Sequence, residues 1–347
     1  MASADQLQFG LDTFGDVTVD AAGQPVASAQ TIRDIVEQAA LADAVGIDAF
    51  GVGEHHRQEF AVSSPEMVLA AVASRSERVR LGTAVTVLSS DDPVRLYERF
   101  ATLDALSGGR AEITLGRGSF VESFPLFGYD LRDYEVLFEE KLELFRLLTR
   151  EQPVTWQGRT RAALDGADVF PKTEHGFPVW VGVGGSPESV VRAARHGFGL
   201  MLAIIGGSAA RFRPFVDLFH RSLESFGHGP RPVGVHSPGH IAETDEQAWD
   251  ELYPAIGSLR DTIGRERGWP PYSRQQFQHE LGPEGAVYAG SPETVARKIA
   301  GTVRSLGLDR FSLKYANGTL SHDRMMRSIE LYGTQVVPRV RELLGAR

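Results

Sequence analysis

The chain has 347 residues, of which 42% are hydrophobic and 23% are charged, and it has no cysteine. This composition is ordinary for a globular protein, and it excludes disulfides, thiolate metal sites and cysteine nucleophiles. A net charge of -9 without any block of Lys or Arg argues against a nucleic-acid partner. No apolar run approaches the ~18 residues of a membrane span, and the first residues lack the pattern of a secretory signal, so we expect a cytoplasmic enzyme with no membrane partner.

Short β-type runs alternate with longer helical runs along most of the chain. In chain order, the pattern predicts strand 7–11, helix 28–45, strand 49–52, helix 65–76, strand 79–85, helix 93–106, strand 111–115, helix 133–150, strand 179–183, helix 187–196, strand 199–204, helix 209–226, strand 233–237, helix 245–259, strand 287–289, helix 293–306, strand 310–315 and helix 323–344. This alternation is typical of a parallel sheet with crossover helices.

About eight such units favour a closed α/β barrel, the (β/α)8 TIM barrel, over an open sheet. No linker divides the chain, so we expect a single domain over residues 1–347. Two segments do not fit the alternation. Residues 153–170 resemble a hairpin insertion, and the polar segment 263–285, with its glycines and prolines, is a candidate lid or cap loop.

The stretch Gly53-Glu54-His55-His56-Arg57 follows the predicted strand 49–52 directly. In a barrel of parallel strands, catalytic groups lie where the strands end. Because adjacent residues of an extended segment point to opposite sides, at most one of the two histidines faces the barrel mouth, which disfavours a shared metal ion. Glu54, His55 and His56 are therefore catalytic candidates that can hydrogen-bond or move a proton. The simpler interpretation is a buried histidine that holds a loop carbonyl.

A first candidate anion site is Gly116-Arg117-Gly118, at the end of the predicted strand 111–115. Glycines allow the backbone to approach a ligand closely, and a guanidinium offers two donors to a phosphate or carboxylate. The alternative is a glycine turn with a solvated arginine.

A second candidate is Gly182-Val183-Gly184-Gly185-Ser186, which runs from a predicted strand into a capped helix. The free N–H groups at a helix start bind anions, and late barrel units commonly bind phosphate there. The segment does not complete the dinucleotide pattern G-x-G-x-x-G, because a proline occupies the last position. A simple turn with a good helix cap remains an equal alternative.

Aromatic residues follow Arg117 and include Phe120 and Phe124. They could wall a pocket for a flat ring or an organic substrate, or form a small core beneath a long loop. Lys314 ends the last predicted strand, where it either faces the barrel mouth and the substrate or is solvated.

The sequence resembles the bacterial luciferase-like family of flavin-dependent monooxygenases over nearly its whole length. The resemblance rests on Gly-Glu-His-His at 53–56, Arg-Val-Arg-Leu-Gly-Thr-Ala-Val at 78–85, Asp-Pro-Val-Arg at 92–95, Leu-Asp-Ala-Leu-Ser-Gly-Gly-Arg at 103–110 and Leu-Gly-Arg-Gly at 115–118. These short sequence motifs in this order are far more specific than any one of them alone.

The resemblance implies a barrel that binds flavin mononucleotide (FMN) at the carboxyl ends of its strands. His55 matches the family's active-site histidine, with Glu54 and His56 beside it. The cofactor-binding positions that it implies are Arg117 with Gly116 for the phosphate, the later phosphate loop Gly184-Gly185-Ser186, and a non-prolyl cis peptide at Ala84-Val85. It also suggests a homodimer, and reduced FMN supplied by a separate reductase because no second nucleotide motif is present.

Departures from luciferase itself indicate a non-luminous relative. Gly116 stands where luciferase has a cysteine, and the later phosphate loop is glycine-rich where luciferase has a glutamate and hydroxyl residues. We therefore expect a monooxygenase that uses reduced FMN and O2 on a small organic substrate. The alternatives are hydride transfer with the deazaflavin F420 in the same barrel, a flavin-binding protein without turnover, and a metal-dependent hydrolase with residues 54–56 as ligands.

Overall fold

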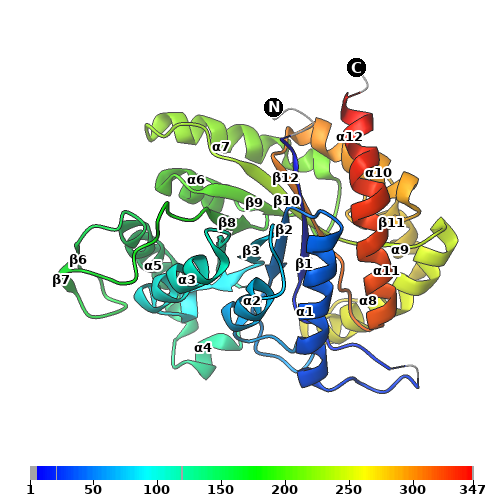
Figure 1. Cartoon of the computed structure of the whole chain (residues 1–347), viewed down its shortest axis with the longest axis horizontal. Coiled ribbons are helices and arrows are strands. Elements are labelled where there is room, and N and C mark those ends of the chain that lie inside the picture. The colour runs from blue at the N-terminus through cyan, green and yellow to red at the C-terminus, as the bar shows by residue number, and fades with distance from the viewer. Residues whose placement is uncertain (1–5, 21, 119, 346–347) are drawn as a thin grey trace.

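The computed structural model describes residues 6–20, 22–118 and 120–345, and their main feature is a ring of parallel strands surrounded by helices (Figure 1). The strands follow the order β3-β2-β1-β12-β10-β9-β8-β5-β4. Their bounds are β1 (Gln8–Thr13), β2 (Ala49–Val52), β3 (Arg80–Thr83), β4 (Thr86–Val87), β5 (Ile113–Gly116), β8 (Val179–Val183), β9 (Gly199–Ala203), β10 (Val233–Ile241) and β12 (Arg310–Lys314).

The ring closes through β3 and β4, which are two halves of one barrel strand separated by the Ala84-Val85 peptide. β3 pairs with β2, and β4 pairs with β5. A parallel bridge joins Leu81 of β3 to Ala111, just before β5. With β3 and β4 counted as one position, the nine strands of the path occupy eight positions. The predicted (β/α)8 barrel is therefore confirmed, and the predicted strand 79–85 is interrupted at its cis peptide.

Helices cover the outside of the ring (Figure 1). The long ones are α1 (Ser28–Ala44), α2 (Pro65–Ala73), α3 (Pro93–Ser107), α5 (Tyr134–Leu148), α6 (Pro187–His196), α7 (Arg213–Ser225), α8 (Asp245–Arg267), α10 (Pro292–Leu306), α11 (His322–Leu331) and α12 (Val337–Gly345). The shorter helical segments are η1 (Leu88–Ser90), α4 (Ser123–Leu126), η2 (Leu131–Asp133), η3 (Ala209–Phe212), the eight-residue helix α9 (Arg274–Leu281) and η4 (Tyr332–Val336). Among the described helices, none combines the length and apolar character of a membrane span.

The helix ends follow from the local sequence. Asp92 begins α3 by accepting hydrogen bonds from the N–H groups of the next turn, and α2, α3, α6 and α10 have proline in their first turn, where a missing N–H costs nothing. Gly108, Gly197 and Gly307 end α3, α6 and α10 in the left-handed conformation that glycine adopts freely.

Strand β12 shows how alternation separates the core from the barrel interior. Phe311 and Leu313 are fully buried in the hydrophobic core. Arg310 and Ser312 point to the other side and line the internal cavity. Inside the barrel, Arg310 forms a buried bidentate ion pair with Glu112, the residue before β5, with 3.0 Å between Nη2 and Oε2. Polar groups thus reach the cavity from strands whose outer faces are apolar.

The two exceptional segments have different outcomes. The hairpin predicted at 153–170 is confirmed, since β6 (Val154–Trp156) and β7 (Leu164–Ala167) pair antiparallel. The segment 263–285 is not the loop that we predicted, because it contains the end of α8 and the helix α9. Lys298 fixes the end of α9 by donating to the carbonyls of residues 280–282. The predicted strand at 287–289 is β11 (Tyr288–Gly290), which pairs with the end of β10 and is not itself part of the ring.

Candidate active site

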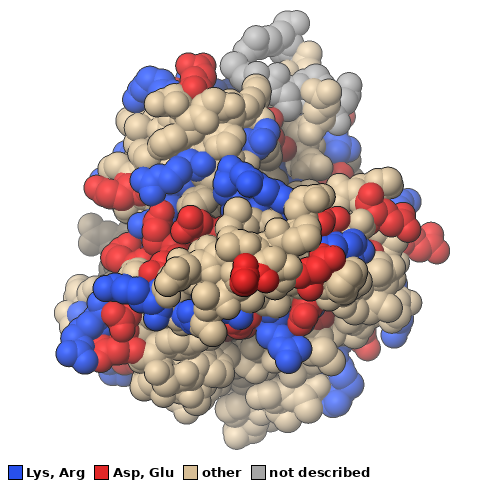
Figure 2. All heavy atoms as spheres, turned by 90° about the vertical axis from the view of Figure 1, so that its left-hand side faces the viewer, with Lys and Arg blue, Asp and Glu red and all other residues tan. Residues whose placement is uncertain are grey.

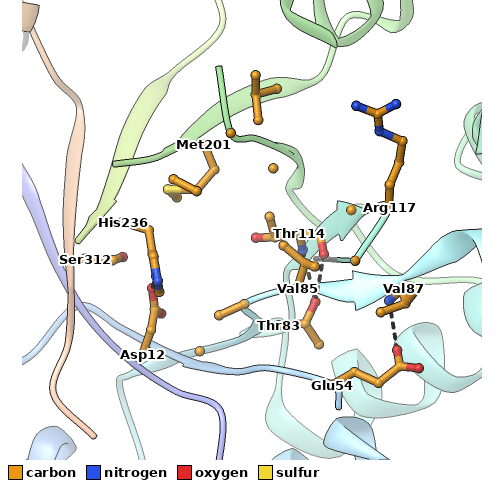
Figure 3. A pocket seen from close by; sticks show the side chains of 18 of the residues that line it. Asp12, Glu54, Thr83, Val85, Val87, Thr114, Arg117, Met201, His236 and Ser312 are labelled. Carbon is orange, nitrogen blue, oxygen red and sulfur yellow. Dashed lines mark hydrogen bonds and ion pairs between the residues drawn. The ribbon is translucent and has the colours of Figure 1, made fainter. Parts of the chain in front are cut away.

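A cavity of about 360 Å³ lies within the ring and is lined by residues from all eight strand positions. Asp12, His236 and Ser312 lie on one side of it, while Glu54 and Arg117 lie on the other (Figure 3). Such a cavity at the carboxyl ends of barrel strands is the usual place for an active site.

The residues after β2 separate as the alternation predicts. His55 lines the cavity, while His56 turns away from it and pairs with Glu54, with 2.8 Å between Nε2 and Oε1. The other carboxylate oxygen of Glu54 accepts from the N–H of Val87, also at 2.8 Å. Through this hydrogen bond the carboxylate of Glu54, which is only 9% exposed, links the end of β2 to β4. This arrangement leaves its two oxygens engaged with protein groups rather than converging with His55 on an ion.

His55 has an apolar setting. Its ring lies 4.3 Å from that of Phe60, 4.9 Å from that of Phe14 and 5.3 Å from that of Phe120 between centroids. Among the described residues its ring nitrogens have no hydrogen-bond partner. Burial, followed by the nearby charges of Lys314, His56 and Arg57, lowers the pKa of His55 to about 3. At neutral pH His55 is therefore an uncharged imidazole that can give or take one hydrogen bond toward the cavity.

Arg117 lies where β5 leads into the following loop and also lines the cavity. Its Nη1 pairs with Glu135, and its Nη2 donates to Ser189 Oγ at 3.3 Å. The guanidinium carbon is 5.1 Å from the centre of the Tyr134 ring. Ser189 and Tyr134 line the cavity too. The guanidinium therefore stands beside the first turn of α6, at the position where an anion could bridge it and the helix start.

The glycine loop before α6 is only partly at the cavity. Gly184 lines it, and a Cβ there would meet nothing within 4 Å. Gly185, with φ of 124°, and Ser186 are not among the lining residues. Ser186 caps α6 by accepting from the N–H of Ser189 at 3.3 Å. This N–H is therefore already satisfied, as the helix-cap interpretation expects.

One wall of the cavity is built around Val85. The Ala84-Val85 peptide bond is cis, as the family resemblance predicts, and both residues line the cavity. A Cβ on Gly116 would lie 2.5 Å from a methyl of Val85, and one on Gly182 would lie 2.9 Å from its other methyl. Real carbon contacts are about 3.5–4.0 Å, so the Val85 side chain occupies the room that side chains at these two positions would need.

The residues predicted to contact substrate differ in position. Phe120 lies beside His55, and its ring is 4.6 Å from the Arg57 guanidinium carbon. Phe124, by contrast, is fully buried and stacks on Tyr134 at 5.6 Å. Lys314 is also buried and donates to Asp16 at 3.0 Å and to the carbonyl of Ala316. None of Phe120, Phe124 and Lys314 is among the residues that line the cavity. Phe124 packs on Tyr134 and Lys314 pairs with the buried Asp16, and a contact of these residues with substrate stays a prediction.

Several cavity residues were missed by the sequence reasoning. Asp12 and His236 pair inside the barrel, with 2.6 Å between Oδ2 and Nδ1. Thr83, Thr114 and Ser312 add hydroxyl groups to the lining. The available signal was a polar or charged residue at an alternate position of an otherwise apolar strand.

Charge on the outer surface is mixed. Figure 2 shows acidic and basic side chains interspersed over the face that includes α5 and α6. Arg192 illustrates this pattern by pairing with both Glu135 and Glu139. Away from the cavity, one group of the described residues has converging potential metal-ligand atoms, formed by Asp34, Glu37 and His322, and residues 54–56 do not form such a group.

Comparisons with known proteins show the family and the fold to which the chain is similar. The chain is 29% identical over 325 residues to a 4-hydroxyprotoasukamycin monooxygenase of Streptomyces nodosus subsp. asukaensis, covering 88% of this chain and 86% of the relative. The fold matches the oxygenating constituent of 3,6-diketocamphane monooxygenase from Pseudomonas putida, described in complex with FMN, with a TM-score of 0.76, 18% identity and coverage of 96% and 98%.

The fold also matches an F420-dependent secondary alcohol dehydrogenase, with a TM-score of 0.73, 19% identity and coverage of 96% of this chain and 99% of that one. At such identities these two structures are evidence for the fold alone. The sequence model of the luciferase-like monooxygenases matches residues 13–310, which is most of the chain. With its barrel and its cavity at the strand ends, the protein belongs to the luciferase-like monooxygenase family.

Proposed function

We propose that the protein is an oxygenase that binds reduced FMN in the barrel cavity and uses O2 to oxidise a small organic substrate. The observation that carries this proposal is that one cavity contains both a guanidinium beside a helix start, Arg117 with Ser189, and an uncharged imidazole, His55. The first suits a phosphate and the second suits a polar edge of a ring system.

The volume and the lining of the cavity support the choice of a flavin. Its volume of about 360 Å³ is within the ordinary range for ligand sites. Gly116 and Gly182 leave the wall free of side chains apart from Val85, so a flat ring could lie against Ala84 and Val85. When bound, reduced flavin supplies the reaction with O2 that delivers an oxygen atom to the substrate.

Phosphate binding falls to Arg117 in this proposal. A phosphate would receive hydrogen bonds from Arg117 and from the Ser189 hydroxyl, and the positive end of α6 would stabilise its charge. Gly184 offers backbone at the open wall of the cavity, and Gly185 and Ser186 complete the loop and start the helix. Glu135, which pairs with Arg117 now, would have to share or release the guanidinium.

His55 would hydrogen-bond a polar atom at the flavin side of the cavity. Its low pKa keeps it uncharged, and Phe14, Phe60 and Phe120 exclude water from its ring. Glu54 would act indirectly, by holding the strand ends around His55 through Val87 and His56. A separate reductase as the source of reduced FMN, and a homodimer, complete the proposal.

The decisive experiment follows reduced FMN and F420 in parallel. Purified protein is mixed anaerobically with each reduced cofactor, and binding is measured before O2 is admitted. We expect reduced FMN to bind and then to be oxidised with incorporation of ¹⁸O into an added substrate from a panel. Binding of F420 alone, with alcohol-dependent reduction of that cofactor, would replace the proposal by hydride transfer. Tight FMN binding without product from any substrate would indicate a flavin-binding protein that lacks turnover.

A further inference from the structure

A second histidine with a different environment faces the same cavity. His236 of β10 and Asp12 of β1 are both buried, at 6% and 7% exposure, and both line the cavity. They lie on the side away from Glu54 and Arg117 (Figure 3). The 2.6 Å between His236 Nδ1 and Asp12 Oδ2 is a short charge-assisted hydrogen bond.

The pair is held in one orientation. Asp12 Oδ1 would be 2.2 Å from a Cβ on Gly51, so the glycine of the neighbouring strand makes room for the carboxylate. The ring of His236 stacks on Phe14, with centroids 5.6 Å apart and planes at 11°. Because Asp12 accepts the proton of Nδ1, the lone pair of a neutral His236 is on Nε2. Among the described residues Nε2 has no hydrogen-bond partner, which leaves it available to a molecule in the cavity.

The two cavity histidines therefore differ in what they can do with a proton. Phe14 lies between them, since its ring meets His55 edge-on at 4.9 Å and His236 face to face. His55 has aromatic neighbours and no carboxylate partner at its ring, so the imidazolium is strongly disfavoured. His236 has the carboxylate of Asp12 in direct contact with its Nδ1, so a counter-charge lies beside its ring.

The surroundings of His236 indicate the kind of molecule that would lie there. Ser312 is its register partner on β12 and adds a hydroxyl group, while Ala203 is its partner on β9. Met201 and Ile205 extend the apolar lining on the β9 side. An apolar skeleton that carries one hydroxyl group matches this combination of a proton acceptor, one hydroxyl and an apolar wall.

We propose that the Asp12–His236 pair is the proton acceptor for the organic substrate, and that this substrate is a phenol or an enol. The O–H bond of the substrate breaks, its proton passes to His236 Nε2, and the electron pair stays on the substrate oxygen. The resulting oxyanion is more electron-rich and is oxidised more readily, and Asp12 balances the charge of the imidazolium. The proton returns to the product or passes to solvent as the product leaves. This inference rests on the proposed function for the oxidation step, but the proton transfer itself does not need the flavin.

The test uses 4-nitrophenol, whose anion is yellow and whose neutral form is not. The purified full-length protein is titrated with this probe in a buffer below the pKa of the probe. We expect wild-type protein to bind it as the anion, with a yellow band. Asp12→Asn and His236→Gln should each lower this band about tenfold or more, because each variant removes one member of the hydrogen-bonded pair that would hold the proton of the probe.

A matched control is the pair of His240, on the same strand as His236, with Glu251 of α8. His240 pairs with Glu251 at 2.7 Å, is fully buried and does not line the cavity. Glu251→Gln therefore removes a similar carboxylate without touching the proposed acceptor, and the yellow band should persist. Circular dichroism and thermal unfolding identify any variant that does not fold. In that case the other member of the pair, or Asp12→Ser, is used instead.

The other charged groups around the cavity make the outcome sharp. Glu54, Glu112, Arg117 and Arg310 line it as well, and Lys314 Nζ lies 4.7 Å from the Phe14 ring centre. If Arg117, Arg310 and Lys314 alone bound the anion, removing the negative charge of Asp12 would strengthen the yellow band. That result, an unchanged band in both variants, or no band in wild-type protein would overturn the inference. Failure of the proposed function would appear elsewhere, as absence of reduced-FMN binding.

Discussion

Replacing Gly116 with alanine tests whether the cavity wall depends on the fit between β5 and Val85. The new Cβ would lie 2.5 Å from one methyl of Val85 and 3.2 Å from the other. Relief of the closer contact requires a movement of about 1 Å, since unstrained carbon contacts are about 3.5–4.0 Å. Val85 is β-branched, so rotation about χ1 exchanges one methyl for another position without clearing the space. We expect a loss of about 1–3 kcal/mol in the free energy of unfolding.

The assay is a double-mutant cycle with Val85→Ala, measured by urea unfolding and by FMN binding. Val85→Ala removes both methyls, so the double variant should recover most of the stability lost in Gly116→Ala, with a coupling of about 1–2 kcal/mol. Gly301→Ala is the control, because a Cβ there meets nothing within 4 Å and the residue lies within α10. Additive effects of Gly116→Ala and Val85→Ala would refute the reasoning, as would full stability of Gly116→Ala alone.

Three further predictions follow from the buried polar groups. Glu54→Ala should cost about 1–3 kcal/mol more unfolding free energy than Glu54→Gln, since only alanine leaves the Val87 N–H without an acceptor; equal urea midpoints would contradict this. The folded-state pKa of His55 is about 3, against an ordinary 6.5, so the unfolded chain takes up its proton first as pH falls through this window. The unfolding free energy should then fall by up to about 2 kcal/mol between pH 6.5 and pH 5, and a His55→Phe variant with the same pH slope as wild type would disprove it. Lys314→Met should cost about 3–5 kcal/mol by leaving Asp16 unpaired, and the added change Asp16→Asn should restore much of this stability; no recovery in thermal unfolding would mean that the pair has no structural role.

The alternation of short β-type runs with longer helical runs was enough to predict the barrel, because a parallel strand buried on both faces is a short continuous apolar run. The strands at 49–52 and 179–183 have the predicted bounds. Helix α9 was missed because Pro270, Pro271 and the glycines near these prolines indicate a loop. Ser273, directly after the prolines, nevertheless caps a new helix. Pattern reasoning locates breaks better than it locates short elements between breaks.

The candidate site was predictable only in part, for a different physical reason. Position at a strand end suffices to find His55 and Arg117, since those residues follow apolar runs directly. The pairing of Asp12 with His236 depends on which strands face each other across the ring, and the two residues are 224 positions apart in the chain. The ion pair of Lys314 was not predictable, because its partner Asp16 lies in a loop whose path the sequence pattern does not specify.

The central claim is that the cavity binds a flavin with its phosphate at Arg117, and a comparison of reduced FMN with reduced riboflavin tests it most directly. The two ligands differ only in the phosphate, so anaerobic titration of each measures what the phosphate contributes. We predict that wild-type protein binds FMN about 10–100 times more tightly, as expected for a charge-assisted contact of about 1.5–3 kcal/mol. Arg117→Met should remove this preference, and Arg132→Met, which changes an exposed arginine paired with Asp130, should keep it. Equal affinity of wild-type protein for the two flavins, or an unchanged preference in Arg117→Met, would contradict the account.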